Sequence, residues 1–109
     1  MLGRCANGRV ITCACCQSIN IEYGSFLFSL SPDAFHAFSE ALSTTPPEAL
    51  IRRSDHVRAL RPYVLQVNED PLMMAFTRDE YDAFRTLISR ACAVHARFAT
   101  ESHFAETRN

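Results

Sequence analysis

The sequence has no lysine and no tryptophan, and its only glycines are Gly3, Gly8 and Gly24. Glycines this sparse exclude a glycine-rich loop that cradles phosphate groups. A membrane-spanning helix would need about eighteen consecutive apolar residues, and a secretory signal would need an apolar stretch near the start. The sequence contains neither pattern, so we expect a cytoplasmic protein that does not enter membranes.

The sequence also lacks an excess of charge of either sign. The 109-residue chain has a formal net charge of −1, and all eleven basic residues are arginine. This balance identifies no charged partner. With 48% hydrophobic residues, a chain of this length should form one domain with a modest core. No nucleophile, base and acid stand in a recognisable pattern, and we therefore expect a protein that is not an enzyme.

Apolar and polar residues alternate in two pairs of short segments, which predicts β-hairpins over 19–30 and 63–76. A helix should follow each hairpin. Ser31 caps the first helix, which runs to about residue 42. Thr77 and Glu80 form a capping box at the start of the second. The sequence thus predicts an α+β fold in which both hairpins join one antiparallel sheet covered by the helices.

The starts of the two helices resemble each other at a constant offset of 46 residues, which indicates an internal repeat. The matched pairs are Asp33 and Asp79, Ala37 and Ala83, and Phe38 and Phe84. The predicted segments are a cysteine-rich ribbon over 1–17, hairpin–helix units over 18–43 and 63–99, a helical connector over 44–62 and a tail over 100–109. Within the connector, Thr45, Pro46 and Glu48 predict a helix over 47–60.

Four of the five cysteines lie in the first sixteen residues. An odd, crowded set of this kind fits a thiolate site in a reducing compartment better than a disulfide framework. The spacing Cys13-x-x-Cys16 is that of a knuckle in which two thiolates converge on one metal ion. Cys5 would supply a third ligand from the same ribbon. We therefore predict a closed, structural zinc site.

Three residues are candidates for the fourth zinc ligand. Cys92 and His95 share one face of the last helix. Cys15 lies nearby, but its adjacency to Cys16 is unfavourable for binding the same ion. Cys92 and His95 also fit ordinary packing at the core, and Cys13 and Cys16 fit a pair of free thiols. A redox dithiol would normally open a helix, whereas a strand follows here. An iron–sulfur cluster needs the same thiolates and is less favoured.

The remaining candidates are weaker. The connector contains an arginine-rich stretch that comprises Arg52, Arg53, Arg58 and Arg61. These side chains could contact nucleic acid, but a solvated helix face is the preferred interpretation. His36 and His56 have no relay partner in the sequence and are expected to be surface histidines.

The stretch from residue 5 to about residue 42 resembles a small bacterial family of unknown function. The resemblance rests on Cys13-x-x-Cys16, on the strand Ile19–Tyr23 that leads to Gly24, and on Leu30-Ser31-Pro-Asp-Ala-Phe35-x-x-Phe38. It implies a cysteine knuckle followed by strand, glycine turn and helix, and no activity. We therefore predict a small zinc-binding interaction or regulatory module whose partner is an unidentified protein or a second copy of the chain. The alternatives are a thiol redox or metal-handling protein that uses Cys13, Cys15 and Cys16, and a weak nucleic-acid binder.

Overall fold

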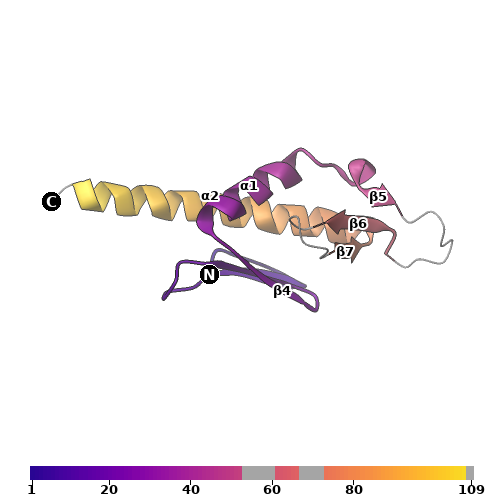
Figure 1. Cartoon of the computed structure of the whole chain (residues 1–109), viewed down its shortest axis with the longest axis horizontal. Helices are drawn as coiled ribbons and strands as arrows, with labels where there is room; N and C mark the ends of the chain where they lie inside the picture. Colours follow the sequence, from indigo (N-terminus) through magenta and orange to yellow (C-terminus); the bar gives the residue numbers. More distant parts are fainter. Residues whose placement is uncertain (53–60, 67–72, 108–109) are drawn as a thin grey trace.

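A computed structural model confirms the predicted α+β class (Figure 1). The structure describes the backbone of residues 1–52, 61–66 and 73–107, with side chains in 1–50, 61–66 and 73–97. In chain order the elements are β1 (Gly3–Cys5), β2 (Gly8–Thr12), β3 (Ile19–Tyr23), β4 (Phe26–Leu30), α1 (Pro32–Ser43), the 3-10 helix η1 (Pro47–Ala49), β5 (Ile51–Arg52), β6 (Tyr63–Gln66), β7 (Met73–Phe76) and α2 (Arg78–Thr107).

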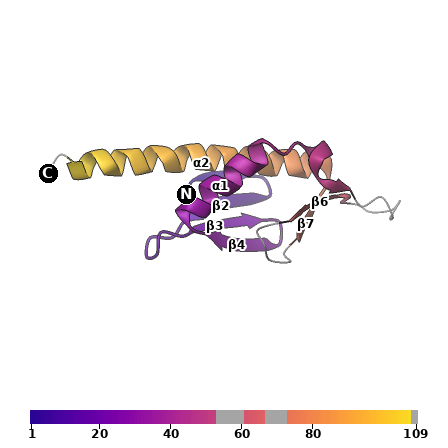
Figure 2. The same cartoon turned by 45° about the horizontal axis from the view of Figure 1, so that its top comes forward.

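The first four strands form an antiparallel sheet in the order of the sequence. Val10 lies opposite Ile21, and both are fully buried because they point to the face that the helices cover (Figure 2). Arg9 and Glu22, one position along, form an ion pair on the other face. The strict alternation of the sequence therefore specifies which face packs against the helices.

The second hairpin does not join this sheet. β6 pairs with β5 on one side and with β7 on the other in a separate three-stranded sheet, so the expectation of one sheet shared by both hairpins is wrong. The first hairpin instead gains its neighbours from the cysteine-rich ribbon, because β2 pairs with the edge of β3 that β4 leaves open and β1 pairs with β2. Both predicted hairpin–helix units are nevertheless present. Whether they descend from one duplicated unit stays a prediction.

Helix α2 packs against both sheets and against α1 (Figure 1). Phe84 on α2 is fully buried and contacts three rings: Tyr23 of the first sheet, Phe38 of α1 and Phe76 of the second sheet. The hydroxyl of Tyr23 also donates a hydrogen bond to the Glu80 carbonyl over 2.9 Å. One aromatic cluster thus joins all the layers of the fold.

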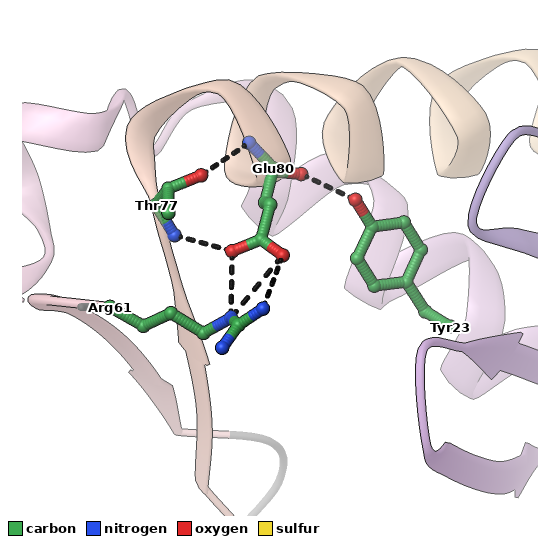
Figure 3. Close-up of polar contacts among 4 residues, drawn as sticks. All are labelled: Tyr23, Arg61, Thr77 and Glu80. Carbon is green, nitrogen blue, oxygen red and sulfur yellow. Dashed lines mark hydrogen bonds and ion pairs between the residues drawn. The ribbon is translucent and has the colours of Figure 1, made fainter.

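Both helices begin where the sequence predicts. The Ser31 side chain accepts a hydrogen bond from the backbone of Ala34, and Pro32 follows it in the first turn. At α2 the capping box is complete (Figure 3): the Glu80 N–H donates to the Thr77 hydroxyl over 3.1 Å, and the Thr77 N–H donates to the Glu80 carboxylate over 2.8 Å. Arg61 forms an ion pair with the same carboxylate.

The hydrogen bond from the Thr77 backbone, and then Arg61, lowers the pKa of Glu80. A carboxyl whose pKa falls on folding stabilises the protein above its ordinary pKa of 4.5 and loses that contribution as the pH falls through the folded value. We expect Glu80→Gln to lower the free energy of unfolding by about 1 kcal/mol or less at neutral pH, and not at about pH 3. Urea unfolding at both pH values measures this. An equal loss at both would contradict it, and Glu40→Gln on the exposed face of α1 is the control.

The helix predicted over 47–60 is wrong where the structure describes it, because only η1 forms before the chain turns into β5. The groups of the predicted capping box are engaged elsewhere: the Thr45 hydroxyl donates to the Ala41 carbonyl, and Glu48 pairs with Arg78. Residues 53–60 lie outside the described part of the chain. At the other end, α2 continues to Thr107, beyond the end predicted at 99.

Among the described residues, no helix is both long enough and apolar enough to cross a membrane.

Candidate functional site

The Cys13-x-x-Cys16 motif forms the connection between β2 and β3, which we call the thiol turn (residues 13–18). The Cys13 N–H donates to the Ser18 carbonyl over 2.8 Å, and the Gln17 N–H donates to the Cys13 carbonyl over 3.0 Å. Gln17 has φ of 61°, a left-handed conformation that reverses the chain directly after Cys16. The backbone is therefore folded into a closed loop around the two cysteines.

Within this turn the thiols are accessible and polarised. Cys15 and Cys16 are exposed and Cys13 is half-buried. The Cys16 sulfur lies 3.1 Å from the Ser18 hydroxyl. Hydrogen bonds from that hydroxyl, from the Cys13 thiol and from the Ser18 backbone lower the pKa of Cys16 to about 7. A large fraction of Cys16 is therefore thiolate at neutral pH, the form that binds metals and attacks disulfides.

Cys5 does not lie with these thiols. It pairs with Gly8 at the first residue of β2, whereas Cys13 follows Thr12 at the last. The five residue steps from Gly8 to Cys13 therefore separate Cys5 from the thiol turn by roughly 16 Å, at ~3.3 Å per residue. The sequence spacing is misleading because Cys5 sits at the closed end of the β1–β2 hairpin. A ligand from the first strand would have to precede Gly3, which pairs with Val10.

Cys92 and His95 lie beside His36, a residue that the sequence did not indicate as part of a site. His36, predicted to be a surface histidine, is half-buried between α1 and α2, and that prediction is wrong. The Cys92 sulfur lies 3.0 Å from His36 Nδ1, and His36 Nε2 lies 2.9 Å from His95 Nδ1. We call these three residues the helical cluster. No spacing within α1 marks His36, because its partners come from a helix more than fifty residues away.

The helical cluster is a chain of contacts rather than a set of ligands around one point, since His36 uses a different nitrogen for each neighbour. In the part of the chain that the structure describes, no three His, Cys, Asp or Glu side chains are placed to hold a metal ion. Burial first, and then the neighbouring His36, lower the pKa of His95. His95 is therefore neutral at physiological pH.

The thiol turn and the helical cluster lie at the same end of the first sheet. Thr12 pairs with Ile19 and Ile19 pairs with Leu30, so the thiol turn leaves the sheet at the edge where the chain enters α1 (Figure 2). His36 lies near the start of that helix. Chemistry-bearing side chains are thus concentrated at one end of the first sheet.

Within the arginine-rich stretch, the structure describes the side chain of Arg61 alone. Arg61 is engaged with Glu80 (Figure 3), and the side chains of Arg52, Arg53 and Arg58 lie outside the described residues, as does that of His56.

The comparisons with known proteins identify a family of unknown function. The model of a family described as "Family of unknown function (DUF6686)" matches residues 1–103. No curated protein and no solved structure matches the chain. The match extends from β1 into the last turns of α2 and so includes both cysteine sites. The chain therefore belongs to DUF6686, a family of unknown function.

Proposed function

We propose that this protein binds a soft divalent metal ion, zinc in the first instance, through the thiolates of Cys13 and Cys16. The observation that carries this proposal is the geometry of the thiol turn, in which Gln17 closes onto the Cys13 carbonyl and reverses the chain with φ of 61°. Such a turn presents two sulfurs, three residues apart, on one side of the backbone. Ser18 also hydrogen-bonds to the Cys16 sulfur, a contact that would orient this sulfur toward a bound ion.

The acidity of Cys16 favours the same function. Zinc binds thiolates, so each ligand must lose its proton before or during binding. Because the pKa of Cys16 is lowered to about 7, one of the two deprotonations costs little at neutral pH. Zinc binding at this site should release protons and should weaken as the pH falls below about 7.

The proposed site is open, unlike the closed structural site expected from the sequence. Cys5 lies at the far end of β2, and Cys92 and His95 are engaged with His36. Two thiolates fill half of a zinc tetrahedron, which leaves positions for water, a small thiol or side chains of a partner protein. An exposed half-site of this kind suits a protein that hands over or shares a metal ion. We therefore favour metal handling over a purely structural role.

Zinc competition with a chromophoric chelator, on the untagged full chain under reducing conditions, tests the proposal. We expect about one zinc per chain, lost in Cys13→Ser and in Cys16→Ser. Cys15→Ser and Cys5→Ser are the matched controls and should retain the ion. Binding that survives both Cys13→Ser and Cys16→Ser would overturn the proposal. Loss of binding in Cys5→Ser would instead restore the closed site, and bound iron would point to a cluster.

A second function for the same residues is thiol–disulfide exchange, and the specific observation in its favour is the hydrogen bond between the Cys13 thiol and the acidic Cys16. The Cys16 thiolate would attack a disulfide, form a mixed disulfide with one half and release the other half as a thiol. Cys13 would then attack the Cys16 sulfur and displace the bound half, which leaves a Cys13–Cys16 disulfide and two free thiols. Incubation with oxidised glutathione distinguishes the functions. Rapid, complete conversion to an intramolecular disulfide together with weak zinc binding would favour exchange.

A further inference from the structure

The helical cluster takes no part in the proposed metal site, yet it joins a thiol to two imidazoles across the α1–α2 interface. We infer that Cys92 is a nucleophilic thiol that reacts with small hydroperoxides, with His36 as its base and His95 as the residue that positions His36. The inference rests on the continuous chain of contacts from the sulfur to the second imidazole, with heavy-atom separations of 3.0 and 2.9 Å.

The contacts are compatible with one arrangement of protons that suits this reaction. If the Cys92 thiol donates to His36 Nδ1, then His36 carries its own proton on Nε2 and donates it to His95 Nδ1. Transfer of the thiol proton to Nδ1 produces a thiolate beside an imidazolium. That imidazolium still donates to His95, so the charge it gains remains hydrogen-bonded.

His95 can fill this role only as a neutral acceptor. Burial and the neighbouring His36 lower its pKa, which keeps Nδ1 free to accept. The ring of Phe35 packs edge-on against both imidazoles, with centroids 6.0 and 6.2 Å away, and fixes their orientation. His95 thus holds His36 as the third member of a catalytic triad holds its histidine.

The accessibility of Cys92 indicates the class of reagent. Its side chain is half-buried and packs against the hydrophobic core, so a small molecule reaches the sulfur more readily than a folded substrate does. Hydrogen peroxide and small alkyl hydroperoxides are suitable electrophiles. The thiolate attacks one peroxide oxygen, an S–O bond forms and the O–O bond breaks. The departing oxygen takes the proton from His36, which gives a Cys92 sulfenic acid and water or an alcohol.

The test uses the full chain freed of metal by a chelator. The protein is treated with limiting hydrogen peroxide and a dimedone-type sulfenic-acid trap, and labelling of Cys92 is followed by peptide mass spectrometry. We expect the rate at Cys92 to fall about tenfold or more in His36→Asn. Asp33→Asn, an exposed change on the first turn of α1, is the control and should leave the rate unchanged. An unchanged rate in His36→Asn would overturn the inference.

A second measurement keeps the inference testable if His36→Asn does not fold. In the wild-type chain, limiting hydrogen peroxide should label Cys92 about tenfold or more faster than Cys5, which is also a half-buried thiol. Equal rates at the two thiols would overturn the inference. The positioning role of His95 predicts that His95→Ala slows the labelling of Cys92 and that His95→Gln, which can still accept a hydrogen bond from His36, restores it.

Discussion

Phe84→Ala is expected to lower the free energy of unfolding by about 3–5 kcal/mol. Phe84 is fully buried, and its ring lies 5.1 Å from Tyr23, 5.3 Å from Phe76 and 6.1 Å from Phe38, measured between centroids. Its removal leaves a cavity where the two sheets and both helices meet. Because domains of this size have only about 5–15 kcal/mol of total stability, part of the population should unfold at 37 °C.

Urea unfolding followed by circular dichroism measures this loss. Leu27→Ala is the control, because Leu27 is also a large apolar residue but is 67% exposed on β4. That substitution should stay within about 0.5 kcal/mol of the wild type. Similar losses for the two variants would show that Phe84 does not join the layers as described.

The second large effect is expected at Gly8. A Cβ atom at this position would lie 2.3 Å from the Glu22 carbonyl oxygen and 2.9 Å from a ring carbon of Tyr23. The carbonyl belongs to the backbone of β3 and cannot rotate away, so Gly8→Ala must push β2 from β3. We expect a loss of about 1–3 kcal/mol or more, measured as a shift of the urea midpoint.

Gly24→Asn is the matched control for Gly8→Ala. Gly24 has a left-handed φ of 58°, but a Cβ there would meet no atom within 4 Å. Asparagine tolerates this backbone conformation, so the substitution should cost much less than Gly8→Ala. Equal costs would mean that the close approach of β2 to β3 is not what requires glycine at position 8.

The parts of the fold that the sequence predicts are those specified by near neighbours. Ser31 caps α1 through Ala34, and Thr77 and Glu80 close their box within four residues. The hairpins follow from alternation and short turns. Thr45 shows the limit of this reasoning. Its sequence pattern is that of a cap for a following helix, but its hydroxyl donates a hydrogen bond to the Ala41 carbonyl of the preceding helix.

What the sequence does not reveal depends on contacts between distant elements. The edge of β3 can accept either the ribbon or the second hairpin, and no local pattern distinguishes the two. For the candidate site, Cys13 and Cys16 are recognisable because their geometry is made within one turn. Cys5 is placed by strand register, and His36 is placed by the packing of α1 on α2. Neither is encoded in spacing.

Helix α2 follows both sheets in the chain, and this order has a consequence for synthesis on the ribosome. The first sheet is complete as a hydrogen-bonded unit once Leu30 has emerged, but its apolar face, with Val10 and Ile21, also packs against α2, whose buried residues among the described side chains run from Tyr81 to Ala91. The part of that face that α2 covers stays exposed while the intervening residues are translated. We expect a nascent chain halted after Phe76 to be aggregation-prone and protease-sensitive. It should become compact only when α2 leaves the exit tunnel.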